Sequence, residues 1–185
     1  ILTNVTISNN TTEFYGGGMR LYNSNPILTN VTISNNTATN QGGGGMFLAS
    51  SHPTLTNVTI SNNTANAGGG MSLYSSDPNL TNSIIWGNSP ESINLYTGNE
   101  EPIITYCDIE GGWADEGNID SDPLFTDPNN DNYNNDDYTL MDNSPCIDAG
   151  TLSVDESIIE DIEYCGEAPD MGAYEYYCVN ETCLS

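Results

Sequence analysis

An acidic stretch at residues 127–137 (DPNNDNYNNDD) is the best candidate for metal chemistry in this sequence. Asp127, Asn129 and Asp131 follow the D-x-N-x-D spacing of calcium loops, and Tyr133, two positions later, is placed to offer a backbone carbonyl. The twelfth position is Tyr138 where such loops carry a bidentate Glu, so a neighbouring carboxylate must replace it. We predict a calcium site, with a solvated Asn- and Asp-rich turn as the alternative. The expected ligands are Asp127, Asn129, Asp131, Tyr133 and Asp137.

Few groups could carry out acid–base catalysis. The sequence has one basic residue, Arg20, and one histidine, His52, which precedes Pro53 in a turn. Polysaccharide lyases need a strong base near bound calcium, and glycoside hydrolases need paired carboxylates. Neither arrangement can be assembled, and no Ser-His-Asp set can be either. We expect no enzyme activity, and we expect the remaining carboxylates to fix turns. These are Asp120, Asp122, Asp148, Asp170 and Glu175.

Five cysteines divide into two groups. Cys107 occupies a position that is apolar in equivalent segments, so we expect a free, buried thiol there. Disulfides are expected among the other four, with their pairing left open. The candidates are Cys146, Cys165, Cys178 and Cys183.

Asn-x-Ser/Thr sequons occur nine times, and three of them are placed in loops. Asn10, Asn35 and Asn62 are therefore the candidates for glycosylation if a glycosylating host makes the protein. The alternative is that Asn and Thr simply serve the turns and ladders of the fold. Trp86 and Trp113 lie beside loops, where we expect them to cover the edge of the fold rather than to bind sugars.

An internal repeat positions all of these residues. Residues 1–26, 27–53 and 54–78 share the pattern LTNVTISNN…GGG-apolar, and residues 79–102 keep it in shortened form. A fifth copy starts at residue 103. Equivalent apolar residues recur 24 to 27 positions apart, which is the period of a solenoid. They are Leu2, Leu28, Leu55, Leu80 and Ile104.

The apolar spacing within one repeat indicates strands. Leu55 and Val58 are three residues apart, so they can share a face only if the chain bends at Asn57. Asparagine suits such a bend because it tolerates left-handed backbone geometry. We predict an all-β, single-stranded parallel β-helix with three short strands per turn of about 25 residues, around Met71–Leu73, Leu55 and Val58–Ile60. No segment shows the apolar period of a helix.

The charge balance excludes several partners. One Lys/Arg against 26 Asp/Glu gives a net charge of −25, which repels nucleic acid and anionic lipid. No apolar run is long enough to insert into a membrane. Few basic residues, abundant Asn, Thr and Gly, and five Cys favour an extracellular or cell-surface location.

Five motifs resemble one large family of secreted bacterial proteins with right-handed parallel β-helix repeats and the pectate-lyase-like fold. They are NSIIWGNSP (82–90), ITYCDIEGGW (104–113), GNIDSDPLF (117–125), SPCIDAG (144–150) and DMGAYEY (170–176). The last two are similar to the family's C-terminal closing segment. The resemblance implies β-helix coils over residues 1–125 and an irregular, acidic, Cys-containing cap over residues 126–185, continuous with the solenoid. It implies no fixed activity.

We therefore expect a noncatalytic extracellular β-helix with a structural or adhesive role. The alternative is a carbohydrate-binding or polysaccharide-degrading surface protein. The expected partners are surface glycans or further copies of the chain, and no cofactor is expected apart from the calcium. Because the sequence opens inside a core strand, we expect either an upstream cap or a second copy to cover that edge. Head-to-tail stacking of copies would produce fibres.

Overall fold

The structure is a computed structural model that describes residues 1–97, 100–128, 136–152, 164 and 166–176. These residues form strands and no helix, so none of them belongs to a helix that is long and apolar enough to span a membrane. The strands are β1 (Leu2–Ser8), β2 (Thr11–Thr12), β3 (Met19–Tyr22), β4 (Ile27–Ser34), β5 (Thr37–Ala38), β6 (Met46–Ala49), β7 (Thr54–Ser61), β8 (Met71–Tyr74), β9 (Asn79–Thr81), β10 (Ile84–Trp86), β11 (Ile93–Leu95), β12 (Ile103–Thr105), β13 (Asp108–Ile109), β14 (Phe125–Asp127) and β15 (Asp137–Leu140).

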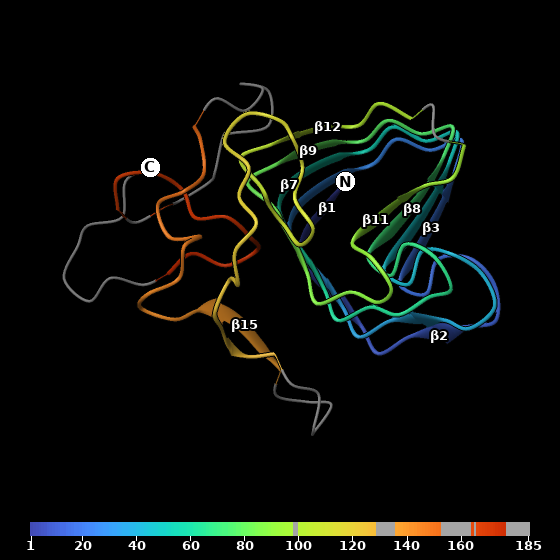
Figure 1. Cartoon of the computed structure of the whole chain (residues 1–185), viewed down its shortest axis with the longest axis horizontal. Helices are drawn as coiled ribbons and strands as arrows, with labels where there is room; N and C mark the ends of the chain where they lie inside the picture. Colours follow the sequence, from blue (N-terminus) through green and yellow to red (C-terminus); the bar gives the residue numbers. More distant parts are fainter. Residues whose placement is uncertain (98–99, 129–135, 153–163, 165, 177–185) are drawn as a thin grey trace.

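Two parallel sheets wind into a coil, as Figure 1 shows. The larger sheet has the order β1-β4-β7-β10-β13, with β9 and β12 continuing from β7. The smaller sheet has the order β3-β6-β8-β11. The short pair β2-β5 lies between the two sheets in the first two turns, and bridges from Thr37 to Thr64 and from Thr64 to Ser89 continue it. The predicted parallel β-helix is confirmed.

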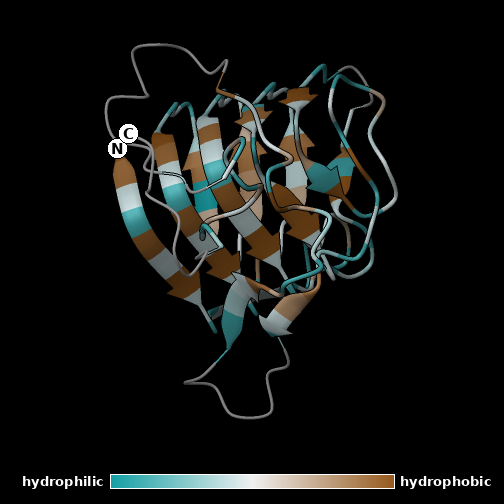
Figure 2. Cartoon of the chain, turned by 90° about the vertical axis from the view of Figure 1, so that its left-hand side faces the viewer, coloured by the Kyte–Doolittle hydropathy of each residue, from teal (hydrophilic) through white to brown (hydrophobic). Residues whose placement is uncertain are grey.

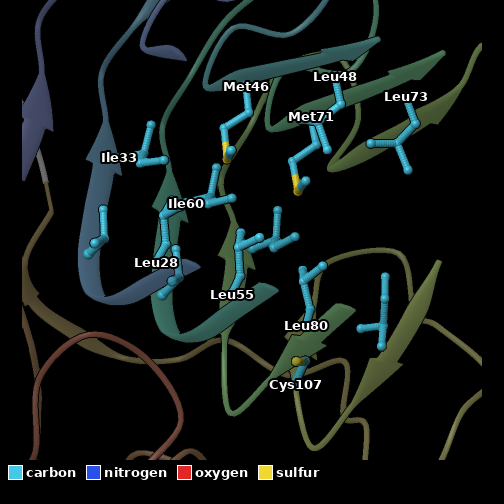
Figure 3. Close-up of a cluster of buried hydrophobic side chains, with 14 of the residues drawn as sticks. Leu28, Ile33, Met46, Leu48, Leu55, Ile60, Met71, Leu73, Leu80 and Cys107 are labelled. Carbon is cyan, nitrogen blue, oxygen red and sulfur yellow. The ribbon is translucent and has the colours of Figure 1, made fainter. Parts of the chain in front are cut away.

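Like residues stack on like residues through the core. Leu28 pairs with Leu55 and Leu55 with Leu80, while Ile33, Ile60 and Ile85 form a second ladder. All of these side chains are buried, and methionine and leucine side chains from the smaller sheet point toward them (Figure 3). The same ladders appear in Figure 2 as hydrophobic bands crossing neighbouring strands. One continuous apolar core therefore fills the coil.

The predicted bend lies at the asparagines. Asn4, Asn30, Asn57 and Asn82 all have left-handed backbones, with φ between 50° and 55°, and Val58 is fully buried beyond the bend. The prediction of separate strands on either side of the bend holds only in the fourth and fifth turns. In the first three turns one strand, such as β7, runs through the bend.

The separation in the later turns has a local cause. Ser83 and Cys107 replace valine, and their side chains accept hydrogen bonds from the turn before: Val58 N–H donates to Ser83 Oγ at 3.1 Å, and Ser83 N–H donates to Cys107 Sγ at 3.3 Å. Side-chain acceptors thus replace backbone carbonyls where the strands separate.

A buried asparagine ladder supports the corner after β1, β4, β7 and β10. The Oδ1 of Asn36 accepts hydrogen bonds from Asn10 N–H at 3.0 Å and Asn10 Nδ2 at 2.9 Å. In the same way, Asn63 Oδ1 accepts hydrogen bonds from the N–H and Nδ2 of Asn36. Asn88 Oδ1 accepts hydrogen bonds from the N–H and Nδ2 of Asn63. Each turn is therefore tied to the next by side-chain amides as well as by backbone pairing.

The chain after residue 119 leaves the coil. We call its described residues 120–128, 136–152 and 166–176 the lateral segment. It packs along the outer face of the larger sheet, as both views show (Figures 1 and 2), through a second apolar cluster. That cluster contains Ile84, Phe125, Tyr138, Leu140, Cys146 and Met171. Where we expected a closing cap over the end of the coil, the described part of the segment covers its side.

Residues 110–119 pack against the C-terminal end of the coil beside the larger sheet. Trp113 packs against the core cluster, and Ile119 forms a parallel bridge with Asp108. At the other end, Leu2, Val5 and Ile7 of β1 are half-buried and pack on the same core. Head-to-tail stacking of copies stays a prediction.

Candidate binding surface

Three exposed tyrosines form a row at the C-terminal ends of the strands of the smaller sheet. Tyr22 ends β3 and Tyr74 ends β8, and the register joins them through Ala49. Tyr96 follows β11, and its N–H donates to Leu73 O at 2.8 Å, which continues the row. The exposed fractions are 67% for Tyr22, 44% for Tyr74 and 57% for Tyr96. We call Tyr22, Tyr74 and Tyr96 the tyrosine row.

The coil sets the spacing of these rings. The ring centroids of Tyr74 and Tyr96 are 5.4 Å apart in an edge-to-face arrangement. Tyr22 and Tyr74 are two turns apart, which is about 10 Å at the strand spacing of about 4.8 Å. The row therefore offers aromatic surface along the coil, with a gap at Ala49.

The other end of the same sheet face is covered. The Phe47 ring stacks on Tyr15 with ring centroids 4.1 Å apart and is almost fully buried. Arg20, the only Lys or Arg in the sequence, places its guanidinium carbon 5.7 Å from the centre of the Tyr15 ring. A cation–π contact thus engages the single basic side chain.

A row of polar turn residues follows the tyrosine row. His52 N–H donates to Asn25 Oδ1 at 2.7 Å, Asp77 N–H donates to His52 Nδ1 at 3.1 Å, and Glu101 N–H donates to Asp77 Oδ1 at 2.8 Å. Because Nδ1 of His52 accepts a backbone hydrogen, the neutral ring carries its proton on Nε2. These side chains join successive turns.

Glu100 lies buried beneath this polar row. Burial alone would raise the pKa of its carboxyl, but hydrogen bonds from the Thr97 hydroxyl at 2.6 Å and the Ser75 N–H at 3.0 Å outweigh burial, with other backbone bonds. Together they lower the pKa of Glu100 to about 2. Glu100 is therefore an ionised acceptor for these turns at neutral pH.

A buried thiol and carboxyl meet where the lateral segment joins the coil. Cys146 Sγ donates to Asp108 Oδ2 at 3.2 Å, and both residues are fully buried. Burial raises the pKa of Asp108 to about 6, and the negative charges of Asp120 and Asp122 also raise it. Burial and the neighbouring Asp108 raise the pKa of the Cys146 thiol. This contact couples the segment to the fifth turn.

Two of the predicted calcium ligands lie within the described residues. Asp127 and Asp137 pair across the β14-β15 hairpin, and Asp137 Oδ1 accepts hydrogen bonds from the Thr139 N–H and hydroxyl. Asn129, Asp131 and Tyr133 lie outside the described residues. Within the part that is described, no three potential ligands gather in one place. Calcium binding in this loop stays a prediction.

The glycosylation candidates all use their amides in hydrogen bonds. Asn10 Nδ2 donates to Asn36, in the ladder described above. Asn35 Nδ2 donates to Asp136 Oδ2 at 2.8 Å, and Asn62 Nδ2 donates to Pro128 O at 2.7 Å. A glycan on Asn35 or Asn62 would compete with the lateral segment for that amide. Glycosylation stays a prediction.

The positions of the cysteines agree with the predicted free thiol at Cys107 and bear on the predicted disulfides. Cys107 is a free, fully buried thiol in the core, as predicted, and burial raises its pKa to about 12. Cys146, a predicted disulfide partner, is also a free thiol, because it faces Asp108 instead of another cysteine. Cys165, Cys178 and Cys183 lie outside the described residues, so a disulfide among them stays a prediction.

The remaining carboxylates bind backbone N–H groups, as we expected of turn-fixing residues. Asp148 Oδ1 accepts from Glu167 N–H at 2.8 Å, and Asp170 accepts from Asp148 N–H and Tyr176 N–H. Asp120 accepts from Gly111 N–H, and Glu175 from Asp170 N–H. These bonds shape the lateral segment and its junction with the coil.

The sequence analysis missed the tyrosine row. Its signal was present, because Met19-Arg-Leu-Tyr22 and Met71-Ser-Leu-Tyr74 occupy equivalent positions in their repeats. Ala49 interrupts the pattern in the second turn and hides it. Only the register places Tyr96 beside Tyr74.

Comparison with known families gives one match. Residues 2–117 match the family model of the right-handed beta helix region. This range spans more than half of the chain and contains the coil and both rows of residues described above. Comparison with curated proteins and with solved structures gives no match.

Proposed function

The chain belongs to the right-handed β-helix family, and we propose that it is a noncatalytic extracellular protein that adheres to neutral surface glycans through the tyrosine row. The observation that carries this proposal is the exposure of Tyr22, Tyr74 and Tyr96 on one edge of a rigid sheet. Aromatic rings present a large apolar surface together with a polar hydroxyl. The apolar faces of neutral sugars pack on such rings, and the phenol hydroxyls can bond to sugar hydroxyls.

The charge of the molecule selects among glycans. A net charge of −25 repels polyanionic polysaccharides over a distance set by the ionic strength. Neutral glycans meet no such repulsion. We therefore assign neutral rather than acidic glycans to the row.

The groups beside the row support a noncatalytic role. His52 Nδ1 and Asp77 Oδ1 each accept a backbone N–H, and Glu100 is held ionised by its hydrogen bonds. These hydrogen bonds maintain the turns between strands. An extracellular location is supported by the low number of basic residues and the sequons.

The test measures binding to insoluble cellulose and chitin by depletion of protein from solution. We expect the double variant Tyr74→Ala/Tyr96→Ala to bind about tenfold more weakly than the unmodified chain, since two aromatic contacts of about 0.5–1.5 kcal/mol each are lost. The matched control is Phe14→Ala. Phe14 is 61% exposed and lies in the loop before β3, at the opposite end of that strand from Tyr22.

Two results would refute this proposal. An equal loss of binding in Phe14→Ala would show that any exposed aromatic residue mediates adhesion. Release of soluble sugars from the same glycans would instead support the alternative of a polysaccharide-degrading protein. Circular dichroism on each variant separates loss of binding from loss of fold.

A further inference from the structure

A groove of about 480 Å³ lies between the coil and the lateral segment, on the opposite sheet from the tyrosine row. The coil contributes Asn62 and Trp86 to its wall, and the lateral segment contributes Asp122, Asp127 and Met141. The two sides are held together next to the groove, because Asn62 Nδ2 donates to Pro128 O at 2.7 Å. The groove is thus formed where contacts hold the coil and the lateral segment together.

Within the described residues, the acidic side chains of the groove have oxygen atoms that accept no hydrogen bond. Asp122 Oδ1 accepts the Leu124 N–H at 3.0 Å. Over the described residues, no hydrogen bond or ion pair reaches Asp122 Oδ2 or either carboxylate oxygen of Asp127. Oxygen atoms of this kind accept hydrogen bonds most strongly from positively charged donors.

The sequence supplies no basic side chain for these carboxylates. Its only Lys or Arg is Arg20, which stacks on Tyr15 in the smaller sheet. Its only histidine, His52, lies beside Asp77 in the polar turn row. The negative charge of the groove is therefore not compensated by a basic side chain from within the chain, and the net charge of −25 strengthens its attraction for cations.

The apolar side of the groove fits a cation that carries carbon. Trp86 is half-buried and packs against the apolar cluster of the lateral segment, and Met141 is 44% exposed. An indole ring attracts an ammonium group by its quadrupole, and tryptophan is the best of the aromatic side chains for this contact. A bare metal ion would make no use of the indole or the thioether.

We propose that this groove binds an alkylammonium group, with the Trp86 indole on one side and the carboxylates of Asp122 and Asp127 on the other. An anion is excluded by the two carboxylates, and a neutral sugar would leave their charge uncompensated. The same chemistry is offered by a free amine and by a lysine side chain of another protein. The proposal does not rest on glycan binding by the tyrosine row.

The experiment follows Trp86 fluorescence in a Trp113→Phe chain, at constant ionic strength. The probes are n-butylammonium, spermidine and N-acetyl-lysine amide, with n-butanol as the neutral isostere of the first. We expect saturable binding of the ammonium probes and none of n-butanol. Asp122→Asn and Asp127→Asn should each weaken binding about two- to fivefold, as expected for exposed charge pairs. A preference for spermidine or for the lysine amide identifies the source of the group.

Glu13→Gln is the matched control, because it removes one negative charge from an exposed loop in the first turn. It should leave binding unchanged. The proposal is overturned if n-butanol binds as well as n-butylammonium, or if Glu13→Gln weakens binding as much as Asp122→Asn. Calorimetry on the unmodified chain gives the same readout if Trp113→Phe does not fold.

Discussion

At Asn36 and Asn63 a single side chain makes four hydrogen bonds to backbone or amide groups. Asn63 Oδ1 accepts two hydrogen bonds from Asn36, and its Nδ2 donates to Ile33 O at 2.9 Å. Buried amides are stable only when their donors and acceptors are paired, and this ladder pairs them with one another through the first four turns. The residue type at this corner is therefore set by hydrogen-bonding capacity rather than by turn propensity alone.

Ile60 tests the core at the same scale. Its side chain is buried between Ile33 and Ile85, so Ile60→Ala leaves a cavity between two turns. We expect the free energy of unfolding, measured by urea denaturation, to fall by about 2–5 kcal/mol. Ile103→Ala is the control, because Ile103 is 60% exposed and its truncation should change stability by less than about 0.5 kcal/mol. Equal losses in the two variants would contradict the assignment of Ile60 to the core.

Residues that repeat could be predicted from the sequence, and residues that occur once could not. The Leu28 and Ile60 ladders and the bend at Asn57 follow from equivalent positions in successive repeats. The Asp108–Cys146 contact joins residues 38 positions apart, and the Asn82–Thr151 pair joins residues 69 apart. No period links such partners, so the lateral position of the segment and the groove appear only in the structure.

At the scale of elements, both faces of the larger sheet are buried by packing. Its inner face fills the core, while its outer row Thr59, Ile84 and Asp108 is buried under the lateral segment. Thr59 Oγ1 accepts the Ala173 N–H at 2.9 Å, and Asn82 exchanges two hydrogen bonds with the backbone of Thr151. The segment thus binds to polar side chains that an isolated coil would expose to water.

This junction should weaken as pH rises. The pKa of Asp108 is about 6 in the folded chain, above its usual value of 3.8, so the folded state holds a proton that the unfolded state releases. The contribution of this proton to stability is fully present below about pH 4 and is lost as pH rises through about 6. Asp108→Asn mimics the protonated form. The difference between the urea midpoint of Asp108→Asn and that of the unmodified chain should therefore increase from pH 4 to pH 8.

The comparison with Asp108→Asn isolates this group from other acids. The pKa of Asp170 is also raised by burial, but Asp170 is present in both chains. The contribution of Glu100 is fully present above about pH 5 and is lost as pH falls toward its folded pKa of about 2, and Glu100 is also present in both chains. If the difference in urea midpoint between Asp108→Asn and the unmodified chain is constant from pH 4 to pH 8, Asp108 does not control the stability of the junction.

At the scale of the whole molecule, the dominant electrostatic feature is self-repulsion. The single basic residue cannot offset 26 acidic residues, and the described part of the chain has only the His52–Asp77 contact as a candidate ion pair. Repulsion of this kind acts through solvent between exposed charges and is screened by salt.

Added salt should therefore stabilise this protein. We expect Tm to rise by about 2–4 °C between 10 and 150 mM NaCl, which corresponds to about 1 kcal/mol in a chain of this size. Differential scanning calorimetry measures the change, and KCl serves as the control because screening does not depend on the monovalent cation. A Tm that is constant or falls with salt would contradict net repulsion as a cost to the fold.

The asparagine ladder has a consequence for how such a chain can change in length. An insertion or deletion of a few residues at this corner would take Asn36 or Asn63 out of line with its neighbours and leave buried amides unpaired. Duplication of one complete repeat restores every pair. The lateral-segment contacts described above begin at Asn35, so a copy of residues 1–26 inserted ahead of β4 would leave them in place. Gene duplication can therefore lengthen this coil in steps of one turn. Insertions or deletions shorter than one repeat at the asparagine ladder would be selected against.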